Sequence, residues 1–170
     1  MIKKILWTSI FALIAGILQS TVLSHLALYR AVPDIALGII VYSAYVNGSM
    51  TGQLAGFSSG ILLDFLSAAP LGLNALIRTL IGALAGLLKG AFFLDFFFLP
   101  MILCAAATLL KAIILFLLHL LFSGGIPAYP LASPVLWVEL AMNVISAPLL
   151  FALLKRFKNL LIKGAAADVK

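Results

Sequence analysis

Ionisable side chains are scarce in this 170-residue chain, and those that interrupt its apolar stretches are the first candidates for chemistry. Five of them lie near the ends of apolar stretches: Asp34, Asp64, Arg78, His119 and Glu139. Lys111 instead lies near the middle of the longest apolar stretch. Charged groups in an apolar medium are costly, so they usually face the interior of a helix bundle and either pair with one another or serve a function.

Two interpretations of these polar groups are open. In the functional one, they join Asn74 and Asn143 in a polar site for a ligand or partner. In the structural one, pairs such as Asp64–Arg78 tie helices together, because the short connection after Asp64 can bring neighbouring helices close. Lys111 is too central to reach either surface, so we expect it to find a carboxylate or carbonyl groups in the interior. The sequence does not identify that partner.

Known catalytic and metal-binding motifs are absent from the sequence. It has no P-loop, no dinucleotide-binding glycine motif and no zinc-protease motif. Its two histidines, His25 and His119, belong to no group with metal-ligand spacing. No serine has a recognisable base partner, nothing in the spacing supports a proton relay, and the basic residues lack the interleaved aromatics of a nucleic-acid surface. We therefore predict a protein that is not an enzyme, uses no cofactor and binds no nucleic acid.

The composition indicates a polytopic membrane protein. The chain is 65% hydrophobic and 9% charged, whereas soluble domains are about 45–50% apolar and about 25% charged. Disordered chains have the opposite bias, poor in apolar residues and rich in charge. A disulfide scaffold is excluded because Cys104 is the single cysteine.

The elements that would position the polar residues are membrane-spanning helices. A bilayer core about 30 Å thick needs roughly 20 apolar residues, and Gly, Pro and Ser clusters separate the apolar stretches. We predict an all-α membrane protein in which residues 1–170 form a single integral membrane domain with a basic cytoplasmic tail at 155–170. The six transmembrane helices are predicted at about 5–26, 33–46, 50–66, 71–88, 96–122 and 134–154.

Two of these helices allow another interpretation. The stretch 33–46 would make only about 21 Å of helix, so it either crosses locally thinned lipid or pairs with 50–66 as a re-entrant hairpin. Lys3 and Lys4 before the first apolar stretch resemble the start of a signal peptide. That stretch runs well past a usual signal core, so we expect an uncleaved helix.

Basic residues distinguish the two sides of the predicted helix bundle. If the helices alternate in direction, one side holds Arg30 alone. The other side holds Lys3, Lys4, Lys89, Lys155, Arg156, Lys158, Lys163 and Lys170. The positive-inside rule then places both termini in the cytoplasm. It also places Asp34, Asp64, Arg78, His119 and Glu139 in the outer half of the membrane. The basic residues after 154 would meet anionic lipid headgroups.

Glycines recur at every fourth position through the third predicted helix. Gly48, Gly52, Gly56 and Gly60 share one face, and Asp64 continues the spacing. Small residues let helix backbones approach closely in lipid, where no hydrophobic force drives helices together. The ridge would serve either internal packing or a groove for a partner helix, and both interpretations are open.

The stretch from Leu18 to Gly90 resembles the bacterial rod-shape-determining MreD family. The resemblance begins with Leu18-Gln19-Ser20-Thr21 and Pro33-Asp34. It continues with the glycine ridge and Phe57, then with the pattern Asp64-x-x-Ser67-x-x-Pro70-Leu71-Gly72. The last third of the chain matches only in character, and Arg78 and Lys111 lie outside the motif.

The resemblance implies a non-catalytic, multi-pass subunit of the bacterial inner membrane. Such a subunit binds MreC, works with MreB, RodA and a penicillin-binding transpeptidase, and helps organise lateral peptidoglycan synthesis and rod cell shape. The family is also similar in fold to the substrate-binding subunits of energy-coupling-factor transporters, so the alternative is a subunit that captures a vitamin or metabolite. The candidate partner or structural residues are Pro33, Asp34, Gly52, Gly56, Gly60, Asp64, Ser67, Pro70, Gly72 and Arg78.

Overall fold

The computed structural model describes residues 1–27, 31–67, 69–91, 97–122, 125–126 and 133–161, and all elements within these ranges are helical. The predicted all-α class is confirmed. The long helices are α1 (Ile2–Thr21), α2 (Ile35–Asn47), α3 (Ser49–Leu66), α4 (Leu73–Leu87), α5 (Phe98–Leu121) and α6 (Pro134–Arg156). Two short elements complete them, the 3-10 helix η1 (Leu23–Leu26) and α7 (Lys158–Leu161).

The first helix is shorter at its C-terminal end than predicted. The α-helix stops at Thr21, and η1 replaces the expected continuation to Leu26. Ser20 and Thr21 both donate their hydroxyl hydrogens to the carbonyl of Ile17, at 3.0 and 2.7 Å. Such local side-chain bonds compete with the backbone ladder, which is why serine and threonine favour helix ends.

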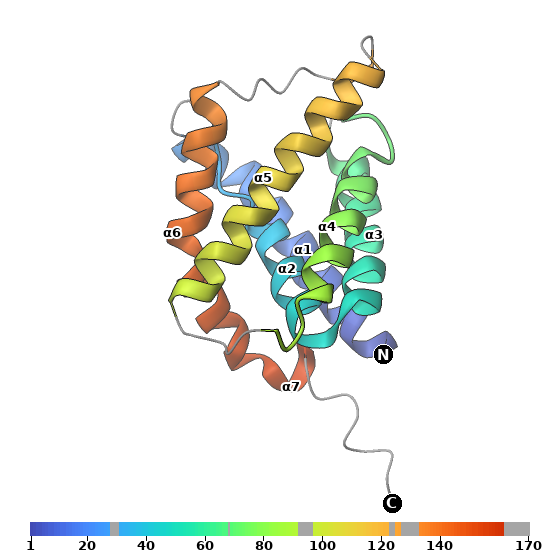
Figure 1. Ribbon diagram of the computed structural model, residues 1–170, viewed down its shortest axis with the longest axis vertical. Coiled ribbons are helices and arrows are strands. Elements are labelled where there is room, and N and C mark those ends of the chain that lie inside the picture. The colour runs from blue at the N-terminus through green and yellow to red at the C-terminus, as the bar shows by residue number, and fades with distance from the viewer. Residues whose placement is uncertain (28–30, 68, 92–96, 123–124, 127–132, 162–170) are drawn as a thin grey trace, which may run out of the picture.

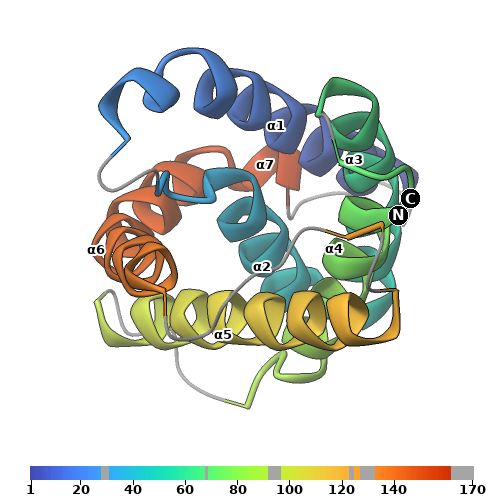
Figure 2. The same ribbon diagram turned by 90° about the horizontal axis from the view of Figure 1, so that it is seen from above.

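The shortest long helix, α2, lies at the centre of the bundle. Seen from above, α1, α3, α4, α5 and α6 surround it (Figure 2). Every residue of α2 from Ala36 to Tyr45 is buried. A helix that is apolar on all sides belongs in a protein interior, so α2 forms the core around which the others pack.

Successive long helices alternate in direction. From α1 to α6 they run up and down in turn, and the N-terminus lies at the same end as α7 (Figure 1). At that end Asn47 Nδ2 donates to Leu161 O at 3.0 Å, and Lys89 Nζ donates to Asn47 O at 3.1 Å. These bonds join the α2–α3 turn to α7 and to the segment that follows α4. Arg30, Lys163 and Lys170, which also entered the predicted charge asymmetry, lie outside the described residues.

Three of the described helices, α1, α5 and α6, are long and apolar enough to cross a membrane. Helices α2 and α4 are apolar but shorter. Six crossings, the cytoplasmic position of both termini and the re-entrant alternative for α2 and α3 therefore stay predictions.

The glycine ridge of α3 lies inside the bundle, against α4. A methyl group added at Gly52 would collide with the backbone of Gly82, and one at Gly56 would collide with the backbone of Arg78. At Gly60 the obstacle is the backbone of Ala75. Because α4 already covers this face, the ridge offers no groove to a partner helix.

Candidate functional site: a buried charge cluster

Asp34 lies at the N-terminal end of α2, deep between the surrounding helices. Its Oδ1 accepts the backbone N–H of Leu37 at 3.0 Å, the bond of an N-cap residue. The side chain is only 5% exposed, and Pro33 before it is also buried. The predicted Pro33-Asp34 start of the second helix thus places a carboxylate in the interior.

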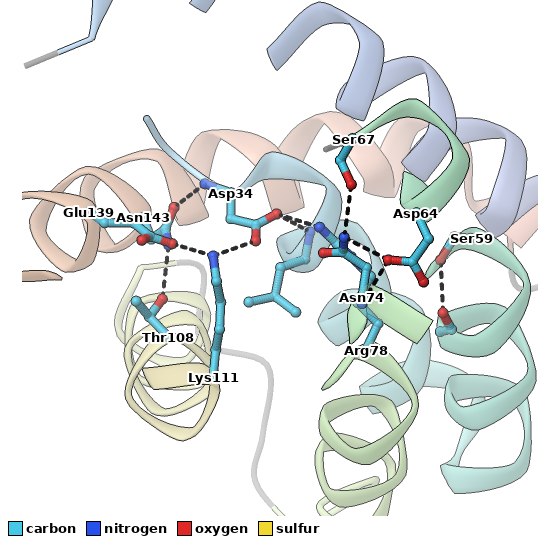
Figure 3. Close-up of polar contacts among 12 residues, drawn as sticks. Asp34, Ser59, Asp64, Ser67, Asn74, Arg78, Thr108, Lys111, Glu139 and Asn143 are labelled. Atoms are coloured by element: carbon cyan, nitrogen blue, oxygen red, sulfur yellow. Dashed lines mark hydrogen bonds and ion pairs between the residues drawn. The ribbon is translucent and has the colours of Figure 1, made fainter. Parts of the chain in front are cut away.

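Two cations and a second carboxylate surround Asp34 (Figure 3). Arg78 Nη2 on α4 lies 3.0 Å from Asp34 Oδ1, and Lys111 Nζ on α5 lies 2.9 Å from Asp34 Oδ2. The same Lys111 Nζ lies 2.6 Å from Glu139 Oε1 on α6. We call Asp34, Arg78, Lys111 and Glu139 the buried charge cluster. It links four helices, and its two positive and two negative charges balance.

Neutral hydrogen bonds extend the cluster between α2, α5 and α6. Asn143 Oδ1 accepts the backbone N–H of Asp34 at 2.7 Å, while its Nδ2 donates to Thr108 Oγ1 at 2.9 Å. Thr108 in turn donates its hydroxyl hydrogen to Cys104 O at 2.8 Å. Both ends of the amide therefore have a partner, which is what a buried polar group requires.

The expected pairing of Asp64 with Arg78 is wrong. Asp64 instead accepts the backbone N–H groups of Gly72 and Asn74, both at 2.9 Å, and that of Ala75 at 3.2 Å. It also accepts Asn74 Nδ2 at 2.9 Å. The first N–H groups of a helix have no partner within it and carry partial positive charge. The carboxylate at the end of α3 therefore caps α4, and Arg78 is left to reach Asp34.

The other predicted site residues belong to the α3–α4 pair. Ser67 Oγ accepts Asn74 Nδ2 at 3.4 Å, and Pro70 O accepts the N–H of Leu73 at 3.1 Å. Gly72 has φ +93°, a left-handed conformation that glycine adopts without strain. With the glycine ridge, these residues fix the hairpin that carries Arg78. His119 lies apart from them, with Nδ1 2.8 Å from Ile126 O.

The list of candidate residues omitted Lys111, Glu139 and Asn143, although each had been noted as a polar group within an apolar stretch, and Thr108 was not singled out at all. The sequence contained a signal for each pair, since Thr108 and Lys111 are three residues apart and Glu139 and Asn143 are four apart. Those spacings put each pair on one helix face. In the structure, the partners of Lys111 are Asp34 and Glu139.

The cluster is suited to holding helices together rather than to holding a metal. Within the described residues no group of three or more His, Cys, Asp or Glu side chains could bind a metal ion. Its carboxylates are committed to Arg78 and Lys111.

A comparison with protein families identifies the chain. The family model described as rod shape-determining protein MreD matches residues 1–157. The chain belongs to the MreD family. The predicted resemblance is thereby confirmed, and it extends beyond Leu18–Gly90 through all six long helices. This MreD-family chain is accordingly a rod-shape-determining membrane protein. No curated protein and no solved structure matches it, and the similarity in fold to transporter subunits stays a prediction.

Proposed function

We propose that this chain is a non-catalytic, multi-pass subunit of the bacterial inner membrane that binds MreC and helps organise lateral peptidoglycan synthesis. The family match over residues 1–157 carries this proposal. MreB, RodA and a penicillin-binding transpeptidase would join the same assembly directly or through MreC.

The buried charge cluster supports a scaffold role. A charge left unpaired in the interior is strongly destabilising, so an arrangement of α2, α4, α5 and α6 that separates the cluster is disfavoured. Arg78 and Asp34 are 7% and 5% exposed. Such a bundle presents its outer surface in one defined shape, as a protein that positions partners must.

The partner-facing surface we propose is the α3–α4 connection. Phe65, Leu66 and Leu71 are 72%, 58% and 73% exposed around it. Phe65 and Leu66 lie in the last turn of α3, and Asp64 beside them accepts the N–H groups of Gly72 and Asn74, so these side chains project from a backbone that Asp64 holds. Large apolar side chains on a fixed support are suitable anchors for a partner chain.

We expect the double substitution Phe65→Ala and Leu71→Ala to reduce the recovery of MreC with the tagged protein by about tenfold or more. Ile145→Ala with Leu149→Ala is the matched control, because these α6 side chains are equally exposed, at 75% and 76%. Quantitative mass spectrometry of the purified complex makes the comparison. Equal MreC recovery from both double variants would remove this surface from the proposal.

The function itself is tested by native purification of the tagged chain in mild detergent, with mass spectrometry of every co-purifying protein. An unrelated tagged inner-membrane protein is the control. The proposal expects MreC and cell-wall-synthesis proteins to be enriched over that control. Recovery of a pair of transporter ATPase subunits in their place would contradict it and favour the metabolite-capturing alternative.

A further inference from the structure

The first and the last described helices meet at one end of the bundle (Figure 1). After α6 the chain turns at Phe157, and α7 then packs against α1. The ring of Phe157 lies against that of Phe11 on α1, with the centroids 5.3 Å apart. Leu161 is fully buried, and its carbonyl accepts the hydrogen bond from Asn47. The segment after α6 is therefore fixed against α1.

This contact brings basic residues from opposite ends of the sequence onto adjoining elements. Arg156 and Lys158 flank Phe157, and both are exposed. Lys3, which is exposed, and Lys4, which is half-buried, lie in the first turn of α1. We call Lys3, Lys4, Arg156 and Lys158 the basic patch.

The two lysines of α1 lie on the side of that helix to which the C-terminal segment is fixed. Lys3, Trp7 and Phe11 are four residues apart, and Lys4 precedes Phe11 by seven, so they share one helix face. The contact of Phe11 with Phe157 shows that this face receives the segment. Because like charges repel, the cations of the basic patch oppose the docking of α7 on α1 unless an anion lies among them.

The chain has too few acidic residues to supply that anion. Of its five acidic residues, three are described, and they are engaged elsewhere. Asp34 and Glu139 belong to the buried charge cluster, and Asp64 caps α4. The other two, Asp95 and Asp168, lie outside the described residues and cannot balance four cations. We therefore expect counter-charge from another molecule.

The apolar side chains around the basic patch indicate which kind of anion fits. Ile2 and Leu6 on α1 are 78% and 52% exposed, and Phe157 and Leu160 beside α7 are 38% and 36% exposed. Basic and large apolar side chains together are typical of the membrane–water interface. A dissolved anion or an acidic peptide matches the charges alone, whereas an anionic phospholipid matches both the charges and the apolar side chains.

We propose that anionic phospholipids bind the basic patch and that their phosphate groups, lying between the cations of α1 and those beside α7, hold α7 in place. The acyl chains cover the exposed apolar side chains. The expectation that basic residues after 154 meet lipid headgroups is thereby extended, because both ends of the chain form one site and the docking of α7 depends on the lipid. This site goes beyond the proposed role in the rod complex and does not depend on contact with MreC.

The test measures hydrogen exchange of α7 in nanodiscs of phosphatidylcholine, alone or mixed with phosphatidylglycerol. The full-length chain is used, and the reporters are the amides of Leu160 and Leu161, which bond to Phe157 O at 3.0 and 3.1 Å. Arg156→Gln with Lys158→Gln is the patch variant. Lys163→Gln with Lys170→Gln is its control, because it removes the same charge from the sequence after α7. Soluble glycerol phosphate, added to phosphatidylcholine nanodiscs, distinguishes a free phosphate from a lipid.

We expect phosphatidylglycerol to slow exchange at Leu160 and Leu161 about tenfold in the unmodified chain and in the control variant, and to leave the start of α4 unchanged. The patch variant should lose this dependence. In phosphatidylcholine alone it should exchange more slowly than the unmodified chain, because its cations no longer repel those of α1.

Four results would overturn the proposal. Equal slowing in the patch variant would show that these cations do not bind the lipid, and loss of the slowing in the control variant as well would show an effect of net charge alone. The same slowing with glycerol phosphate would identify a site for free phosphate. No slowing in the unmodified chain would exclude a lipid bridge and leave an acidic protein segment as the partner. None of these results depends on MreC recovery.

Discussion

At the scale of single residues, Asp34 has the largest role, because its carboxylate is the link between Arg78 and Lys111. Removing one partner from a buried ion pair leaves an uncompensated charge, whereas replacing a whole pair with apolar groups is often nearly neutral. The cluster therefore stabilises the bundle only while its charges balance.

Asp34→Asn should lower the free energy of unfolding by about 3–5 kcal/mol, since it leaves two buried cations facing Glu139 alone. Thermal unfolding of the purified protein in detergent measures the loss. The double variant Asp34→Asn, Arg78→Met removes a whole pair and leaves the Lys111–Glu139 pair intact, and we expect it to recover most of that stability. A double variant less stable than Asp34→Asn would show that Arg78 contributes by something other than its charge.

In the structure, Asp64 caps α4 and does not pair with Arg78. A second substitution tests whether Asp64 nevertheless supports the position of Arg78. Asp64→Asn should cost about 1–2 kcal/mol, because an amide oxygen accepts the N–H groups at the start of α4 less well than a carboxylate. Hydrogen exchange should accelerate at Gly72, Asn74 and Ala75 and stay unchanged around Asp34. Faster exchange around Asp34 as well would indicate that Asp64 supports Arg78 after all.

The sequence was informative about which residues are polar and less so about their partners. Apolar context alone marked Asp34, Arg78, Lys111 and Glu139 as unusual. Proximity along the chain favoured Asp64–Arg78, but Asp64 had nearer partners in the backbone at the start of α4. The contact of Arg78 with Asp34 joins residues 44 positions apart, and it depends on α2 lying beside α4, which no local pattern encodes.

At the scale of helices, the α3–α4 hairpin is the unit that carries the site. Its glycines bring the two backbones into contact, and the Arg78 backbone itself lies against Gly56. The four-residue spacing predicted this face, because small residues at that interval mark close helix packing in membranes. What the spacing did not show is that the covering helix is the neighbouring α4.

Gly56→Leu should force α3 and α4 apart and displace Arg78, at a cost of about 3 kcal/mol or more. Gly125→Leu is the matched control, since nothing lies within 4 Å of a Cβ added there. Thermal unfolding of both variants gives the comparison. Equal stability of the two variants would contradict close packing along the ridge.

At the scale of the whole molecule, the number and order of the long helices followed from apolar length and from Gly, Pro and Ser breaks, but the central position of α2 did not. Its short length first suggested thinned lipid or a re-entrant hairpin. The helices around it, α1, α3, α4, α5 and α6, explain why it is apolar on every side (Figure 2). A helix without an amphipathic pattern indicates burial, yet it does not say which neighbours provide it.

We propose that this MreD-family chain supports rod shape as a scaffold, and that its buried charges hold the bundle together rather than move ions or protons. The direct measurement is cell shape after the native gene is replaced by the Asp34→Asn, Arg78→Met variant, with the wild-type chain and Asp34→Asn alone as controls. We expect rods with the wild-type chain and with the double variant, and rounded cells with the destabilised single variant. Rounded cells with a double variant that is stable and still recovers MreC would contradict this proposal, because the charges would then have a function beyond folding.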